Sequence, residues 1–148
     1  MKAYIMCGLP GSGKSTFVRE YLKGVTIISR DFIRFQLGLA NSVDEKVVGS
    51  KEEEDTVTNI QNKLIKSCID NDQDFVIDGI NNITHRKELI EGLNKRYVIG
   101  INIKTTLEKC IEARKGRIPE EVLRELYSDW VYISSEEVDE IWEIGRAS

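Results

Sequence analysis

The residues with the clearest potential for chemistry lie near the amino terminus, in the stretch GLPGSGKST. Gly8, Gly11, Gly13, Lys14 and Ser15 fit the pattern G-x-x-x-x-G-K-[ST] in full. In this pattern the glycines let backbone N–H groups approach phosphate oxygens, the lysine reaches the β and γ phosphates, and the hydroxyl binds Mg²⁺. An apolar stretch precedes the loop and a helical pattern follows it, as the motif requires. The loop therefore predicts binding of a nucleoside triphosphate.

A carboxylate at the end of the run DFVID is expected to complete the nucleotide site. Asp78 is interpreted as the group that holds a Mg²⁺-bound water, or alternatively as a contact to the acceptor or a loop cap. Asn81 is expected to orient Asp78 or to touch the substrate. ATP and Mg²⁺ are the expected ligands, with the metal on Ser15 and, through water, on Asp78. The predicted ATP-binding residues are Gly8, Leu9, Pro10, Gly11, Ser12, Gly13, Lys14, Ser15 and Thr16.

A second pair of polar residues follows the short β-branched run VTIIS. Asp31 and Arg34 are three residues apart, so a helix would place both side chains on one face. Phosphoryl transfer to an alcohol needs a general base near the γ phosphate, and a carboxylate can serve. We predict that Asp31 accepts the proton and that Arg34 holds a phosphate of the acceptor. The residues alone leave open that Asp31 caps a helix and that Arg34 is a solvated side chain.

Two other classes of P-loop protein are disfavoured because their motifs are missing. A GTPase needs a base-reading motif such as NKxD, and neither Asn62-Lys63 nor Asn94-Lys95 is followed by that aspartate. Motor ATPases usually carry a DE pair after the third strand, whereas Asp78 is followed by glycine. The short chain and its basic segment before Pro119 favour a small phosphotransferase.

The elements that must position these groups alternate between strands and helices. Strands are expected at residues 2–7, 25–29, 74–78, 97–103 and, as a short last strand, 131–133. Helices are expected at residues 15–22, 31–39, 52–70, 84–93, 107–115 and 119–130. A terminal helix is expected after Ser134 or Ser135, with Val138, Ile141 and Trp142 facing inward. This alternation predicts one α/β domain over residues 1–148, with a parallel sheet flanked by helices.

In such sheets ligands bind beyond the carboxyl ends of the strands. The glycine loop, the turn before Asp31, and Asp78 all follow predicted strands, so we expect them to converge on one site.

The composition limits the partners of the chain. Its 148 residues are 41% hydrophobic and 31% charged, which is typical of one globular domain. The formal net charge of −4 means that binding to a polyanion requires a local basic patch. No apolar run approaches the roughly 20 residues of a membrane helix, so we expect no membrane partner. Cys7, Cys68 and Cys110 form no CxxC motif and are expected to be buried, reduced thiols, which fits a cytoplasmic protein.

These motifs, in this order, resemble the polynucleotide 5′-hydroxyl kinase family of the P-loop kinase superfamily, most closely the kinase half of bacteriophage kinase-phosphatases. The resemblance covers nearly the whole chain. It rests on the stretches GLPGSGKST, ISRDFIR, VIDGINNITHRK and CIEARKGRIPEEVLRELY. The loop alone is widespread, whereas the RD-x-x-R element and the arginine-rich segment before the I-P dipeptide are more specific. The resemblance implies ATP-dependent phosphorylation of DNA or RNA 5′ ends, as in nucleic acid repair, and the host cytoplasm if the chain is phage-encoded.

The resemblance also implies roles for particular residues. Asp31 matches the general base of the family, and Arg34 matches the arginine that engages the 3′-phosphate of the acceptor. Lys14 and Ser15 match the P-loop residues. Ile80 stands where the D-x-T-N motif of the family has a threonine, so that hydroxyl contact is lost here.

The resemblance further implies a lid, over about residues 112–128, that brings an arginine to the transferring phosphoryl group. Arg117 is the first choice by register and Arg114 the second. Ala113 replaces the first arginine of the family's R-N-x-x-R pattern. A mobile arginine also suits phosphoryl transfer on physical grounds, and the residues alone leave open that Arg114, Lys115 and Arg117 form a solvated helix end.

The acceptor is open at this point between a polynucleotide 5′ end and another alcohol. The other alcohols considered are a nucleoside, a small metabolite or antibiotic, and a hydroxymethylated base in DNA. A non-catalytic nucleotide-binding module is a third possibility, and multimeric family members suggest a homo-oligomer. Candidate contacts to the phosphates of a nucleic acid 5′ end are Arg34, Arg86, Lys87, Lys95 and Arg96. Stacking on a base would suit Phe32, Phe35 or Tyr127, although each is expected in the core.

Overall fold

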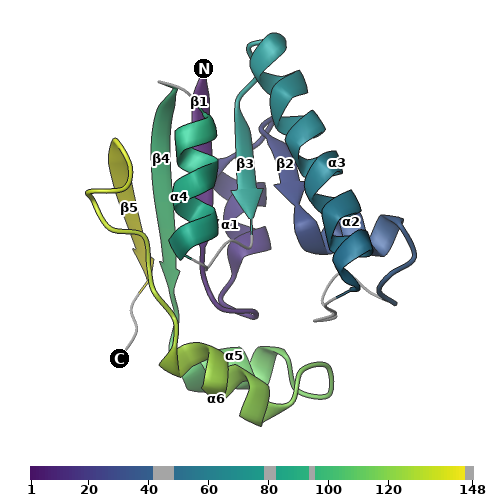
Figure 1. The fold of residues 1–148 in the computed structure, drawn as a ribbon. Coiled ribbons are helices and arrows are strands. Elements are labelled where there is room, and N and C mark those ends of the chain that lie inside the picture. Colours follow the sequence, from purple (N-terminus) through teal and green to yellow (C-terminus); the bar gives the residue numbers. More distant parts are fainter. Residues whose placement is uncertain (42–48, 79–82, 94–95, 146–148) are drawn as a thin grey trace.

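The computed structural model describes residues 1–41, 49–78, 83–93 and 96–145. These residues form a single α/β domain in which five parallel strands have the order β2-β3-β1-β4-β5 (Figure 1). The strands are β1 (Lys2–Cys7), β2 (Thr26–Ser29), β3 (Phe75–Asp78), β4 (Tyr97–Lys104) and β5 (Glu140–Gly145). The helices are α1 (Lys14–Tyr21), α2 (Arg30–Gln36), α3 (Lys51–Asp70), α4 (Ile83–Gly92), α5 (Leu107–Ala113) and α6 (Glu120–Ser128). The predicted fold class is confirmed.

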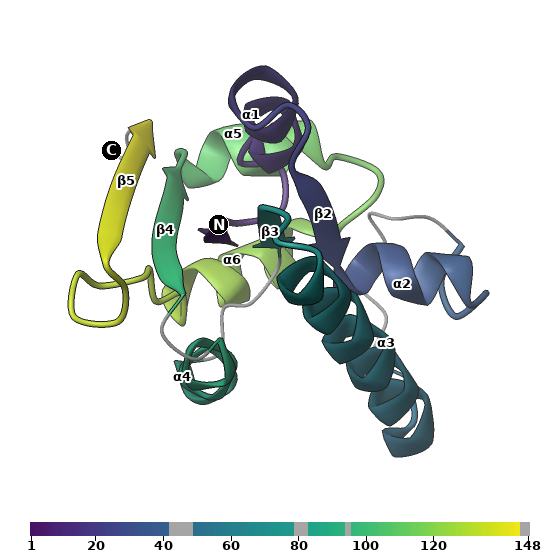
Figure 2. The ribbon, with the colours of Figure 1, turned by 90° about the horizontal axis from the view of Figure 1, so that it is seen from above.

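The central strand β1 is buried on both of its faces, which divides the core into two layers. Ala3, Ile5 and Cys7 face a layer to which α3 and α4 contribute. Tyr4 and Met6 face a layer to which α1 contributes. Figure 2 shows α1 on one side of the sheet and α3 and α4 on the other. Such continuous burial is expected for the middle strand of a parallel sheet that helices cover on both faces.

The three cysteines lie in these layers or beside them. Cys7, Cys68 and Cys110 are buried and free, as predicted. Burial raises the pKa of the Cys7 and Cys110 thiols, which keeps both thiols protonated at neutral pH. Among the described helices, none combines the length and the apolar character needed to cross a bilayer.

The strand expected at residues 131–133 is not formed, because side chains rather than a neighbouring strand bind its backbone. The amide of buried Asn102 donates to the carbonyl of Ile133 and accepts from its N–H, each at 2.9 Å. Arg86 donates to the carbonyls of the two residues before Ile133, at 3.1 and 3.4 Å. Backbone polar groups that are withdrawn from water need partners, and here side chains provide them, including a contact from the Cys7 thiol to the carbonyl of Val131.

The terminal helix expected after Ser134 is wrong, because Glu140–Gly145 form the edge strand β5. The spacing of Val138, Ile141 and Trp142 suits a helix, yet neighbouring residues of a strand also bury opposite faces. Ile141 packs on the layer shared with α3 and α4, and Trp142 packs on the layer shared with α1. Pairing with β5 satisfies the backbone of β4 and leaves a more polar strand at the sheet edge.

Arg86, expected as a contact to the acceptor, is instead a structural residue with 0% exposure. Its Nε and Nη2 donate to the two carboxylate oxygens of Glu137, at 2.8 and 3.2 Å. Although burial opposes it, this pairing holds the pKa of Glu137 below its ordinary value. Of the other candidate contacts, Lys87 and Arg96 are exposed and Lys95 lies outside the described residues.

We expect Arg86→Ala to lower the free energy of unfolding by about 3 kcal/mol, because it removes the cation that pairs with the Glu137 carboxylate and a donor to each of two carbonyls. Urea unfolding followed by tryptophan fluorescence measures this loss. Lys87→Ala, on the exposed side of the same helix, is the matched control and should change stability by less than about 0.5 kcal/mol. Equal effects of the two variants would show that Arg86 does not hold the fold together.

Candidate functional site

The glycine loop joins the end of β1 to the start of α1 in a conformation suited to phosphate. Gly13 stands just before the first helical residue with φ 100°, a left-handed value that side chains with a Cβ rarely adopt. The N–H of Ser12 donates to the carbonyl of Leu9 at 3.0 Å, and the hydroxyl of Thr105 donates to the carbonyl of Ser12 at 2.8 Å. The loop is thereby fixed at a helix N-terminus, where backbone N–H groups attract anions.

Lys14 and Asp78 form an ion pair beside this loop. Lys14 Nζ lies 3.3 Å from Asp78 Oδ1, and the two side chains are 16% and 26% exposed. Asp78 Oδ1 is buried, and none of the described donors has the geometry of a hydrogen bond to it. The contact is therefore electrostatic, and this buried oxygen retains the capacity to accept a hydrogen bond. A water on a Mg²⁺ ion is a suitable donor, and Ser15 presents an exposed hydroxyl in the first turn of α1.

The register of the sheet brings the predicted strand ends together. Asp78 at the end of β3 pairs with Met6 of β1 on one side and with Ser29 of β2 on the other. Asp31 follows two residues after Ser29, so the loop, Asp78 and Asp31 lie at one edge of three neighbouring strands. Asn81, the other predicted contact, lies outside the described residues.

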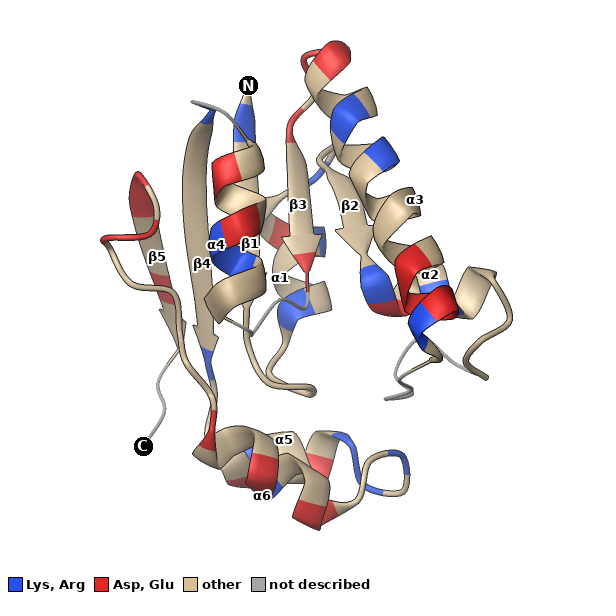
Figure 3. Ribbon diagram, viewed as in Figure 1, with Lys and Arg blue, Asp and Glu red and all other residues tan. Residues whose placement is uncertain are grey.

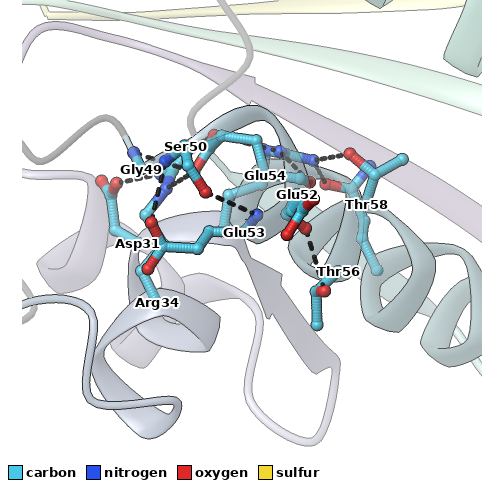
Figure 4. A network of polar contacts seen from close by, with 11 residues as sticks. Asp31, Arg34, Gly49, Ser50, Glu52, Glu53, Glu54, Thr56 and Thr58 are labelled. Carbon is cyan, nitrogen blue, oxygen red and sulfur yellow. Dashed lines mark hydrogen bonds and ion pairs between the residues drawn. The ribbon is translucent and has the colours of Figure 1, made fainter.

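Helix α2 carries both members of the predicted acid–base pair. The hydroxyl of Ser29 accepts from the N–H of Phe32 at 3.3 Å, which starts the helix directly after β2. Asp31 thus lies in the first turn, where the helix dipole favours a carboxylate. Arg34 Nη1 donates to Asp31 Oδ1 at 2.9 Å, and the Asp31 side chain is 31% exposed (Figure 4). The expected shared face is confirmed, and the carboxylate remains accessible.

The sequence gives no direct sign of a third member of this network, Glu54 of α3 (Figure 4). Arg34 donates from Nε to Glu54 Oε2 at 2.9 Å and from Nη2 to Glu54 Oε1 at 2.6 Å. The bonds from Arg34 lower the pKa of Glu54 to about 2 and raise the pKa of Arg34. A sequence pattern just before Glu54 could have indicated its position. Ser50 and Glu53 form a capping box, which fixes where α3 begins and so where Glu54 points.

Arg30 anchors the two helices on which this network is built. Its Nη1 donates to the hydroxyl of Thr58 at 3.0 Å and to the amide oxygen of Gln61 at 3.2 Å. Its Nη2 lies 3.4 Å from Glu54 Oε1. Arg30, the first arginine of the RD-x-x-R element, therefore joins α2 to α3. Arg34, the second arginine, pairs with the carboxylates of Asp31 and Glu54.

Arg114, Lys115 and Arg117 of the expected lid lie between α5 and α6, and these two helices lie beyond the carboxyl ends of the strands (Figures 1 and 3). Gly11 has φ 84°, and a Cβ there would lie 2.9 Å from the carbonyl oxygen of Cys110 and 3.3 Å from Cγ of Arg114. The glycine loop thus packs closely on the end of α5. Arg114 is half-buried against the loop, whereas Lys115 and Arg117 are exposed in the turn.

The aromatic side chains expected in the core are exposed instead. Phe32, Phe35 and Tyr127 are 44%, 41% and 43% exposed. Helix α2 has seven residues, and Ile33, at 3% exposure, is the one buried against the core. The rings of Phe32 and Phe35 lie 6.3 Å apart at 38°. Because Phe35 is four residues after Asp31, it lies on the same side of the helix as that carboxylate.

The parallel sheet and the glycine loop together define the class of this protein, a P-loop domain of the kinase-like type. Residues 4–126 match the family model described as AAA domain, and the chain belongs to that family. No curated protein sequence matches the chain.

Solved structures with the same fold include several kinases. A chain of the Pnkp1/Rnl/Hen1 RNA repair complex is 19% identical, with a TM-score of 0.74 over 86% of this chain and 43% of that chain. A putative kinase from Chloroflexus aurantiacus J-10-fl is 13% identical, with a TM-score of 0.72 over 97% and 86% of the two chains. A sugar kinase from Janibacter sp. HTCC2649 is 16% identical, with a TM-score of 0.64 over 96% and 84%. The chain therefore shares the fold of kinase-like P-loop proteins, and this likeness of fold does not select an acceptor.

Proposed function

We propose that the chain transfers the γ-phosphoryl group of ATP to the 5′-hydroxyl end of a polynucleotide, DNA or RNA. The observation that carries this proposal is the Asp31–Arg34 pair at the carboxyl end of β2, separated from the glycine-loop strand only by β3. A carboxylate can take the proton of an alcohol, and the adjoining guanidinium can hold a phosphate of the same acceptor. The resemblance to polynucleotide 5′-hydroxyl kinases supports this acceptor.

The proposed roles combine the positions of these side chains with the roles that the resemblance implies. The loop at residues 8–16 holds the phosphates of ATP, and Lys14 exchanges Asp78 for the β and γ phosphates. Arg34 holds the 3′-phosphate of the terminal nucleotide while Asp31 takes the proton from its 5′-hydroxyl. Ser15 and, through water, Asp78 would hold Mg²⁺, which when bound offsets the negative charge of the phosphate oxygens.

The proposed lid, over about residues 112–128, supplies the remaining positive charge. The transition state of phosphoryl transfer spreads charge over three equatorial oxygens, and a mobile arginine can meet it on closure. Arg114 packs against Gly11 of the glycine loop, and Arg117 is exposed in the same turn three residues later, which supports a role for one of them.

We expect Phe35→Ala to raise the KM for a 5′-hydroxyl oligonucleotide by about fivefold or more, because stacking on a base contributes about 1–3 kcal/mol. The kcat and the KM for ATP should change little. Tyr21→Ala is the matched control, since Tyr21 is a 68% exposed aromatic on α1, away from Asp31. Steady-state kinetics with varied oligonucleotide measure the difference. An unchanged KM would remove Phe35 from the acceptor site.

One observation favours a second candidate, a kinase of an alcohol that carries no phosphate. The carboxylate of Glu54 already binds the Nε–Nη2 edge of Arg34 through two hydrogen bonds, so the acceptor need not supply an anion there. A label-transfer panel separates the candidates. It offers γ-labelled ATP with a 5′-hydroxyl oligonucleotide, a nucleoside 3′-monophosphate, free nucleosides, sugars and DNA containing hydroxymethyluracil.

The proposal requires label at the oligonucleotide 5′ end, and label only on an internal base, a free nucleoside or a sugar would contradict it. Binding of ATP without hydrolysis or transfer would support a non-catalytic module instead.

A further inference from the structure

The guanidinium of Arg34 is only partly available to a ligand. It carries five N–H groups, and three of them donate to carboxylates, two to Glu54 and one to Asp31. The remaining two have no partner among the described residues. Figure 4 shows the carboxylate of Glu54 beside the guanidinium, in the two-bond arrangement that a phosphate also uses. The Arg34 side chain is 13% exposed, so a ligand can approach it over a small area only.

We propose that Glu54 is an internal competitor for the phosphate of the acceptor. By filling the Nε–Nη2 edge of Arg34, it confines that phosphate to the two remaining N–H groups and so fixes its place relative to Asp31. This inference rests on the proposed function, which assigns Arg34 to the acceptor. Glu54 is then a positioning and selectivity residue, acting on the acceptor through Arg34.

The structure holds Glu54 too firmly for an incoming phosphate to displace it easily. Besides Arg34, the carboxylate accepts from the backbone N–H of Gly49 at 3.4 Å and contacts Arg30 at 3.4 Å. The capping box between Ser50 and Glu53 fixes the helical turn that carries it. The depressed pKa of about 2 means that the pairing is present above pH 4.5 and lost only as the pH falls through about 2. The competitor is thus charged at any pH at which the chain would act.

Removing the competitor should improve binding of the anion and impair turnover. A free Nε–Nη2 edge offers an acceptor phosphate two more charge-assisted bonds, which strengthens its binding. The phosphate would then sit where Glu54 was, away from the position that suits proton transfer to Asp31. A residue that only joined α2 to α3 would not raise anion affinity when changed.

The test compares Glu54→Gln with wild type in two measurements. Calorimetric titration with inorganic phosphate and with a nucleoside 3′-monophosphate is run after the glycine loop has been saturated with a non-hydrolysable ATP analogue. We expect both anions to bind Glu54→Gln about tenfold more tightly than wild type. Kinetics should show a lower KM and a kcat reduced by about tenfold or more for acceptors with a 3′-phosphate, and no lower KM for those without it.

The controls separate this inference from folding and from the proposed function. Glu52→Gln changes an exposed carboxylate in the same turn and should leave both measurements unchanged. Adding Arg34→Ala to Glu54→Gln should abolish the tighter binding. If Glu54→Gln does not fold, Glu54→Asp, one methylene shorter, replaces it and should also bind the anion more tightly.

Unchanged or weaker anion binding by a folded variant, or no measurable binding by either protein, would overturn the inference. If wild type fails to phosphorylate 5′-hydroxyl ends, the proposed function fails, while the titration still decides the role of Glu54.

Discussion

Asp31→Asn is expected to lower kcat for phosphoryl transfer by about 10³-fold, within the range of a lost general base. Asparagine keeps the size of the side chain and one oxygen for Arg34 Nη1, but it cannot take up the proton of an alcohol. ATP affinity should stay within about twofold, because Asp31 is on α2, whereas the proposed nucleotide contacts are in the loop between β1 and α1, in the first turn of α1 and at the end of β3. Initial rates of label transfer and fluorescence titration with an ATP analogue give the two values.

The control for this substitution is Asp55→Asn, which neutralises an exposed carboxylate of α3. Its kcat should equal that of wild type. A variant Asp31→Asn that retains a tenth or more of the wild-type kcat would show that another group takes the proton. An equal loss of ATP affinity would place Asp31 on the donor side of the reaction instead.

Arg117→Ala is expected to lower kcat by about 10³-fold, because a lid arginine meets charge that develops only in the transition state. Arg114→Ala should chiefly raise the KM for ATP, since its stem packs against Gly11 in the nucleotide loop. Steady-state kinetics with varied ATP separate the two effects. Arg124→Ala, which removes a 53% exposed arginine of α6, is the control and should change neither constant.

Comparing the two variants decides which arginine has the catalytic role. A large loss of kcat for Arg114→Ala and a small one for Arg117→Ala would move the catalytic role to Arg114. Losses below about tenfold for both variants would contradict a catalytic lid, given the size expected of such arginines.

The parts of the fold that the sequence predicts are those set by local pattern. Three segments are predicted correctly: the glycine loop after a buried strand, the β-branched run before Asp31, and the run DFVID that ends in a carboxylate. In each of them an apolar run typical of a strand is followed directly by residues capable of binding or catalysis. All three lie at the same edge of the sheet in the structure. Local pattern was sufficient there because each polar residue directly follows the strand that places it.

The parts that were missed depend on residues far apart in the chain. Glu54 meets Arg34 across 20 residues, and Arg86 meets Glu137 across 51. A charged side chain is normally exposed, so nothing in the local sequence marks Arg86 as buried until its partner is known. The helix predicted after Ser134 is wrong for the same reason, because the spacing of Ile141 and Trp142 fits a helix and the pairing with β4 involves residues about 40 positions earlier in the chain.

The measurement that tests the central claim most directly is the structure of a complex with a non-hydrolysable ATP analogue, Mg²⁺ and a short 5′-hydroxyl oligonucleotide. The account predicts that a carboxylate oxygen of Asp31 lies roughly 2.6–3.2 Å from the 5′-oxygen of the acceptor. It further predicts that this oxygen is in line with the γ phosphate held over residues 8–16. An Asp31 carboxylate turned away from the 5′-oxygen, with the oligonucleotide bound elsewhere on the domain, would contradict it.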